Sequence, residues 1–153
     1  MRHSAAADLL NAPHILLVDD NRNGLIVRKA LLQEIGYQVE TAENGEQALA
    51  LVGKATFDVI VTDYRMPRMN GAELIEKLRR SDPQARIIML SGFVDALALC
   101  EQSTGADIVL AKSSNEPAHL VRSIKRLLNR PKTRKPPASQ KAPAAAKTKA
   151  VVR

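Results

Sequence analysis

Aromatic residues are scarce in this chain of 153 residues, which has no Trp, two Tyr and two Phe. An extended surface for stacking nucleic-acid bases is therefore not expected. The one cysteine, Cys100, has no partner for an internal disulfide and no Cys or His neighbours at the spacing of a zinc site. With 45% apolar and 25% charged residues, the composition is that of a soluble globular protein with an aliphatic core.

Long hydrophobic runs are also missing. The longest aliphatic stretches, such as residues 15–18, are far shorter than a bilayer span, and residues 1–5 lack the apolar segment of a secretory signal. We therefore expect no membrane contact and a cytoplasmic location.

Positive charge is unevenly distributed along the chain. The net charge is +7, yet residues 130–153 hold eight basic residues, four prolines and no acidic residue, so the rest sums to −1. A segment of this composition cannot bury a core, which predicts a disordered basic Ala/Pro/Lys tail rather than a second output domain. Its basic residues are Arg130, Lys132, Arg134, Lys135, Lys141, Lys147, Lys149 and Arg153.

Residues 1–12 are interpreted as a short leader and residues 13–129 as one folded domain. Within this domain, apolar β-rich runs alternate with helical patterns, which is typical of a doubly wound α/β fold with a parallel sheet. Three of the predicted strands are nearly continuous apolar runs, as expected when helices cover both faces of a sheet. The predicted strands are residues 14–18, 38–41, 57–62, 86–90 and 108–110.

Five helices are predicted between and after these strands. The first carries apolar residues at helical spacing from residue 25 to 35 and ends at Gly36, and the last begins near residues 114–115 with Pro117 in its first turn. The second and third, 46–54 and 72–80, each follow an Asn-Gly pair. The fourth, 94–103, is apolar nearly all round, which fits a helix lying flat on the sheet or a face that meets a dimer mate.

Chemistry in an open parallel sheet is expected beyond the carboxyl ends of its strands. Three carboxylates gathered there repel each other, and a hard cation with oxygen ligands, best Mg²⁺, relieves that repulsion. A hydroxyl and an ammonium beside them suit the oxygens of a transferred phosphoryl group. Because no Cys or His follows these strands, a carboxylate is the nucleophile and an aspartyl phosphate the product. The polar residues at these ends are Asp19, Asp20, Asp63, Ser91 and Lys112.

Four segments at these ends resemble the receiver domain of two-component response regulators. They are Leu-Val-Asp-Asp-Asn at 17–21, Asp-Tyr-Arg-Met-Pro-Arg-Met-Asn-Gly at 63–71, Ile-Met-Leu-Ser-Gly at 88–92 and Gly-Ala-Asp-Ile-Val-Leu-Ala-Lys at 105–112. The resemblance covers roughly residues 13–129 and implies a flavodoxin-like five-stranded sheet in the order 2-1-3-4-5 with five helices. It also implies a response regulator of the stand-alone, single-domain type.

The resemblance implies a role for each of the site residues. Asp63 accepts a phosphoryl group from a sensor histidine kinase or a phosphotransfer protein. Asp20, Asp63 and the backbone carbonyl of Arg65 bind Mg²⁺, and Asp19 acts mostly through water. The remaining catalytic residues are Lys112, which pairs with the phosphoryl group, and Ser91, which turns toward it on activation.

The resemblance also implies partner surfaces. The chain signals by binding a downstream protein or by relaying the phosphoryl group, and it turns over no metabolite. The fourth and fifth helices carry the readout and a possible homodimer contact. The first helix selects the kinase through a face predicted to be exposed, with the candidates Arg22, Asn23, Arg28 and Lys29.

The sequence departs from the family pattern at two positions. Val109 stands where an aromatic switch residue is usual, and Ser113 stands where a proline usually follows the active lysine. Two further residues bear on the lifetime of the phosphoryl group, because Arg65 can cover it and Phe93 offers no hydrogen bond to an attacking water. We therefore predict a long-lived aspartyl phosphate.

Two alternative functions are weighed against this interpretation. In one, the receiver controls a basic tail that binds DNA or RNA. In the other, the chain is a phosphatase-like enzyme with an aspartyl nucleophile, which is disfavoured because Arg65 stands where a second acid is usual. The histidines, His14 among them, have no carboxylate at a spacing that the sequence reveals, and Cys100 is interpreted as a packing residue.

Overall fold

The computed structural model describes residues 11–92 and 99–130. Their five strands form one parallel sheet in the order β2-β1-β3-β4-β5, which confirms the predicted fold class. The strands are β1 (His14–Val18), β2 (Gln38–Ala42), β3 (Val59–Asp63), β4 (Ile87–Ser91) and β5 (Ile108–Ala111). The parallel arrangement brings the carboxyl ends of all five to one edge of the sheet.

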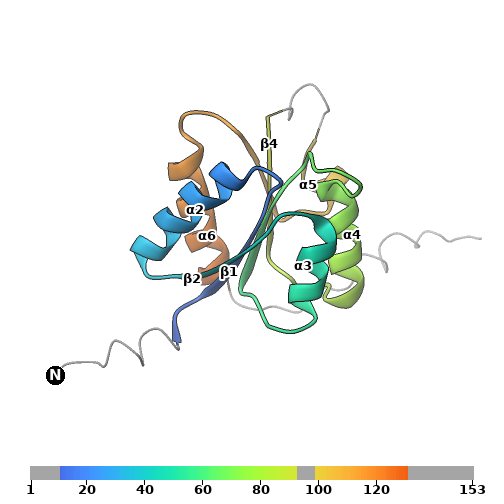
Figure 1. Ribbon diagram of the computed structural model, residues 1–153, viewed down its shortest axis with the longest axis horizontal. Helices are drawn as coiled ribbons and strands as arrows, with labels where there is room; N and C mark the ends of the chain where they lie inside the picture. The colour runs from blue at the N-terminus through green and yellow to red at the C-terminus, as the bar shows by residue number, and fades with distance from the viewer. Residues whose placement is uncertain (1–10, 93–98, 131–153) are drawn as a thin grey trace, which may run out of the picture.

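Five helices in the described ranges cover the sheet on its two faces (Figure 1). One face is covered by α2 (Arg22–Ile35) and α6 (Glu116–Asn129), and the other by α3 (Gly45–Val52), α4 (Gly71–Ser81) and the short α5 (Glu101–Thr104). Right-handed crossovers between neighbouring parallel strands place helices in this way.

Alternate residues of each strand contribute to two separate aliphatic layers. In β1, Ile15 and Leu17 pack toward Leu32 of α2, whereas Leu16 and Val18 belong to the layer on the side of α3 and α4. All five residues of β3 and all five of β4 are buried. The apolar runs noted in the sequence are therefore strands with both faces covered, as predicted.

Asparagine caps fix where three helices begin, directly after the loops at the functional edge. The Asn21 side chain accepts hydrogen bonds from the backbone N–H groups of Asn23 and Gly24, and Asn44 accepts one from Gln47. Asn70 forms a reciprocal capping box with Glu73. Each cap satisfies backbone donors that would otherwise be left unpaired at a helix start, so the strand-end loops are held short and ordered.

The fourth predicted helix differs from the structure. The described helix α5 begins only at Glu101, and Leu99 and Cys100 lie outside it. Cys100 has an extended backbone, and its N–H donates to the Ser103 side chain at 3.0 Å, which starts the helix at the following residue. The rest of the prediction, over 93–98, falls outside the described residues.

The predictions for the chain ends and for His14 have different outcomes. The leader up to residue 10 and the basic tail from residue 131 lie outside the described residues and stay predictions. His14 does have a carboxylate neighbour, because the register of β1 and β2 brings Glu40 Oε2 to 2.6 Å from its Nε2. Within 11–92 and 99–130, no helix has the length and apolar character needed to cross a membrane.

Replacing Ile88 by Ala is expected to lower the free energy of unfolding by about 2–5 kcal/mol. Ile88 is fully buried in β4, so the substitution leaves a cavity between the sheet and its helices. Ile26→Ala is the matched control, because Ile26 is 65% exposed, and its expected effect stays within about 0.5 kcal/mol. Urea unfolding of both variants measures the two effects, and equal losses would contradict the two-layer core.

Candidate functional site

The carboxyl edge of the sheet brings together the polar residues predicted from the strand ends. Asp19 and Asp20 follow β1, and Asp63 is the last residue of β3, the strand beside it. Ser91 ends β4, and its carbonyl accepts a hydrogen bond from the backbone N–H of Lys112 at 2.9 Å. Residues from four strand ends thus meet in one region.

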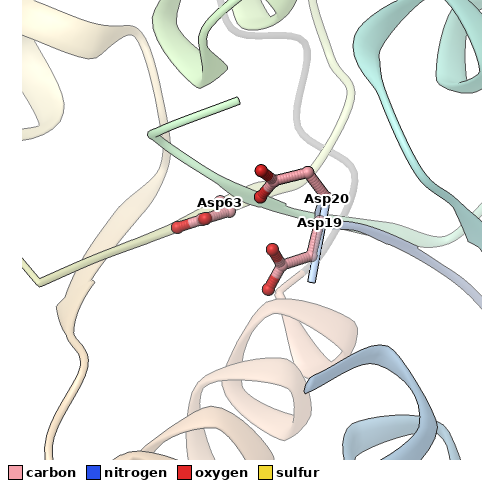
Figure 2. Close-up of side chains that lie close together, drawn as sticks. All are labelled: Asp19, Asp20 and Asp63. Atoms are coloured by element: carbon pink, nitrogen blue, oxygen red, sulfur yellow. The ribbon is translucent and has the colours of Figure 1, made fainter. Parts of the chain in front are cut away.

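Three carboxylates form the centre of this edge. One oxygen from each of Asp19, Asp20 and Asp63 lies within 4.8 Å of the other two (Figure 2). Asp19 and Asp63 are buried, whereas Asp20 is exposed. Like charges this close disfavour each other's ionised form, so the cluster favours a cation at its open side.

Lys112 provides a positive charge against this cluster. Its Nζ lies 2.9 Å from Asp63 Oδ1 and 3.7 Å from Asp19 Oδ2. Asp63 Oδ1 also accepts a hydrogen bond from the backbone N–H of Tyr64 at 3.0 Å. The ammonium is partly exposed, so it has room to follow an oxygen that is added to Asp63.

Burial raises the pKa of Asp63, and the neighbouring charge of Asp19 adds to the rise. The Lys112 ammonium and the Tyr64 N–H act in the opposite direction, because they stabilise the carboxylate. The net effect is a pKa above the usual value. Lys112 alone therefore does not fully offset the cost of ionising Asp63, and an additional cation would stabilise its carboxylate form.

Sequence reasoning missed two residues of this region, Arg28 and Glu116. Arg28 was assigned to the exposed face of the first helix, but its side chain is only 13% exposed and lies 3.0 Å from Asp19 Oδ2. Arg22 and Asn23 of that set are exposed, and Lys29 is half-buried. Helical spacing could have placed Arg28 correctly, because it lies three residues after Leu25 and four before Leu32, which are both buried.

The remaining predicted site residues lie at or near the same edge. Ser91 is buried at the end of β4, and Arg65 is exposed in the loop after β3. Val109 packs against the aliphatic layer on the side of α3 and α4. After Lys112, the chain turns through hydrogen bonds to Ser113, whose carbonyl accepts from the Glu116 N–H at 3.0 Å.

The donor set fits a hard divalent cation. All of the clustered ligand atoms are carboxylate oxygens, which Mg²⁺ prefers, and the exposed Asp20 leaves the cluster accessible from solvent. Asp19 is already engaged on both oxygens. Its Oδ1 accepts from the Asn21 N–H at 3.0 Å, and its Oδ2 faces two cations. Asp20 and Asp63 are thus the carboxylates better placed to bind a metal directly.

Gly71 allows the loop after β3 to fold back against Asp63. Its N–H donates to the Tyr64 carbonyl at 2.7 Å. A Cβ at this position would lie 2.9 Å from the Tyr64 Cα and closer still to the Asp63 carbonyl oxygen. Because both neighbours are backbone atoms, only glycine allows this approach without displacing the strand that carries Asp63.

A family model described as the response regulator receiver domain matches residues 15–125. The chain belongs to the response regulator receiver family. This confirms the resemblance found from the motifs at the strand ends.

Among curated relatives, a response regulator receiver protein of Anaeromyxobacter sp. is 48% identical over 84 residues, which cover 54% of this chain and 35% of that protein. CpxR of Klebsiella pneumoniae, a transcriptional regulatory protein, is 38% identical over 117 residues, or 76% of this chain and 49% of CpxR.

This receiver therefore spans less than half the length of these two relatives, but it matches solved receiver structures over nearly their whole length. TrrA of Thermotoga maritima, solved with Mg²⁺-BeF, is 35% identical with a TM-score of 0.68, over 76% of this chain and 99% of TrrA. A structure of the histidine kinase ThkA in complex with TrrA matches with a TM-score of 0.69 and 35% identity, over 76% of this chain and 99% of the matched chain. A CheY-like receiver of Methanospirillum hungatei is 32% identical with a TM-score of 0.71, over 78% and 95%.

Gly71→Ala is expected to destabilise the receiver by about 1–3 kcal/mol or more, because the added methyl group must displace backbone atoms next to Asp63. Gly53→Ala is the control. Gly53 has right-handed backbone angles, and its nearest atoms would lie 3.5 Å and 3.6 Å from the new Cβ. We expect it to be neutral or to stabilise by up to about 1 kcal/mol. Chemical unfolding compares the two, and a neutral Gly71→Ala would refute the close approach.

Asp63→Asn is expected to raise the free energy of unfolding of the metal-free receiver at neutral pH. The folded-state pKa of Asp63 lies above its unfolded value, so the stability linked to this group is present at acidic pH and is lost as the pH rises through the folded pKa. Asn does not titrate and avoids that loss. The advantage of the variant should therefore shrink as the pH falls, which urea unfolding with a chelator measures. An advantage that grows toward acidic pH would contradict the raised pKa.

Proposed function

We propose that this receiver is a phosphorylation switch, in which Asp63 accepts a phosphoryl group from a histidine kinase or a phosphotransfer protein. The observation that carries the proposal is the position of Asp63. It is buried at the end of a central strand, with an ammonium 2.9 Å from its Oδ1 and two further carboxylates beside it. This is an arrangement for a carboxylate nucleophile, a metal and a phosphoryl group together.

In the proposed reaction, a carboxylate oxygen of Asp63 attacks the phosphorus atom of a phosphohistidine. The oxygen–phosphorus bond forms, the phosphorus–nitrogen bond breaks, and the imidazole nitrogen leaves and takes up a proton. Bound Mg²⁺ would offset the negative charge of the phosphoryl oxygens. Asp20 and Asp63 would hold that metal with the backbone carbonyl of Arg65, and Asp19 would act through water.

Lys112 and Ser91 are assigned to the product state. The Lys112 ammonium already contacts Asp63 Oδ1, so it is placed to pair with the oxygens of a phosphoryl group added to Asp63. Ser91 ends the adjacent strand and supplies a hydroxyl that turns toward the new group. Phosphorylation adds about 1.5–2 negative charges, and the resulting rearrangement is the signal.

The partner in this proposal is a histidine kinase, supported by the complex of the related TrrA with the kinase ThkA. The phosphorylated receiver then binds a downstream protein or passes the group on, and it turns over no metabolite. The nucleic-acid alternative rests on the basic tail, which lies outside the described residues. Nothing in the described ranges favours that alternative.

The experiment is intact-protein mass spectrometry after incubation with acetyl phosphate and Mg²⁺. The wild type is expected to gain the mass of one phosphoryl group, and Asp63→Asn or removal of Mg²⁺ abolishes the gain. Asp58→Asn is the matched control, because Asp58 precedes the same strand at the opposite end of the sheet and should not matter. A wild type that takes up no phosphoryl group would refute the proposal.

Lys112→Met is expected to slow the same phosphorylation by on the order of 100-fold, because one preorganised cation at the reacting oxygens is lost. The rate of mass gain measures this effect. Lys125→Met on α6 serves as the control and keeps the wild-type rate, because Lys125 lies elsewhere, in a pocket with Tyr37 and Asp58. Equal rates for Lys112→Met and wild type would remove Lys112 from the mechanism.

A further inference from the structure

The Arg28 guanidinium links the acidic cluster to the first turn of α6. Its Nη1 lies 3.0 Å from Asp19 Oδ2, while its Nη2 and Nε donate to Glu116 Oε1 at 2.6 Å and 3.1 Å. The Arg28 side chain is 13% exposed, and Glu116 is buried. Three separate elements, the end of β1, helix α2 and helix α6, therefore share one ion-pair network.

We propose that the charge of Arg28, together with its counter-charge Glu116, sets the Mg²⁺ affinity of the acidic cluster. The proposal rests on the metal site assigned above. Arg28 is not a metal ligand. Its charge reaches the cluster at Asp19, whose Oδ2 lies 3.0 Å from Arg28 Nη1.

The geometry supports an electrostatic role for Arg28. Figure 2 shows the Asp19 carboxylate turned toward the side of the sheet where α2 and α6 lie, while Asp20 points to the other side. Arg28 and Lys112 both face Asp19 Oδ2, at 3.0 Å and 3.7 Å. A guanidinium stays charged at any pH that the protein experiences. Its charge therefore permanently reduces the negative potential that a divalent cation meets at the cluster.

Glu116 limits this effect. Its Oε1 takes two of the Arg28 N–H groups, and its negative charge cancels part of the guanidinium's field at the cluster. The guanidinium contacts the cluster directly, at Asp19 Oδ2, whereas Glu116 contacts the guanidinium at its other two nitrogens. The pair therefore has a small net positive influence on the metal site, and removing either partner shifts that influence in a known direction.

Isothermal titration of Mg²⁺ into the folded, unphosphorylated receiver tests the proposal. Arg28→Met removes the positive charge and is expected to tighten Mg²⁺ binding on the order of fivefold. Glu116→Gln leaves that charge uncancelled and is expected to weaken binding by a similar factor. The double variant should bind more tightly than wild type but less tightly than Arg28→Met. Arg28→Lys keeps the charge, so it should stay close to wild type.

These signs separate an electrostatic role from a structural one. Loss of a merely structural contact would lower stability and weaken Mg²⁺ binding in both single variants, whereas the proposal predicts opposite shifts. Unfolding without metal records the stability of each variant. The control is the exposed pair Arg80 and Glu76 on α4, joined at 2.7 Å, where Arg80→Met and Glu76→Gln should leave the affinity within twofold.

Three results would overturn the inference. They are equal Mg²⁺ affinity in all variants, weaker binding by Arg28→Met, and tighter binding by Glu116→Gln. If Arg28→Met does not fold, the other two variants still test the proposal. Glu116→Gln should bind Mg²⁺ more weakly than wild type, and the double variant should bind it more tightly. A wild type that binds no Mg²⁺ would instead overturn the metal site itself, which distinguishes failure of the proposed function from failure of this inference.

Discussion

Repulsion among the carboxylates of Asp19, Asp20 and Asp63 is the constraint around which the functional edge of this receiver is built. A parallel sheet brings the carboxyl ends of its strands to one edge, so acidic residues at the ends of β1 and β3 become neighbours. Such a cluster is tolerated only where positive charge is supplied. The rest of the site follows from how that charge is provided.

Two basic side chains from distant parts of the sequence supply this positive charge. Lys112 follows β5 and contacts both Asp63 and Asp19, and Arg28 lies on α2 and contacts Asp19. Both oxygens of Asp19 thereby have protein partners, while Asp20 stays exposed. The cluster is thus closed on the side of α2 and α6 and open to solvent at Asp20, which suits a metal that retains several waters.

Burial and charge act together at Asp63. The aliphatic layers pack on both faces of β3 and bury the Asp63 carboxylate at its end, and this burial raises the pKa of Asp63. Asp63 thus combines a buried carboxylate base with a partly exposed ammonium beside its Oδ1. Gly71 completes the arrangement, because it lets the following loop return against the Asp63 backbone.

Local signals predicted most of the fold. Each of the five predicted strands overlaps the observed one, since apolar β-rich runs mark strands covered on both faces. The starts of α3 and α4 were recognisable because each follows an Asn-Gly pair, whose Asn caps the helix. The fourth helix was placed wrongly at 99–100 because an apolar series on all sides has no periodicity to mark its boundary. The hydrogen bond from the Cys100 N–H to the Ser103 side chain fixes the start of α5 at Glu101.

The sequence by itself determined the five strands, most of the helices and the polar residues at the strand ends, because all of these depend on patterns within a few residues. Only the tertiary structure decided which charges face each other. Arg28 and Glu116 are 88 residues apart, and their ion pair exists because α2 and α6 lie on the same face of the sheet. The interaction of two charges depends on their distance in space and on the solvent between them, and neither quantity is written in the spacing of residues along the chain.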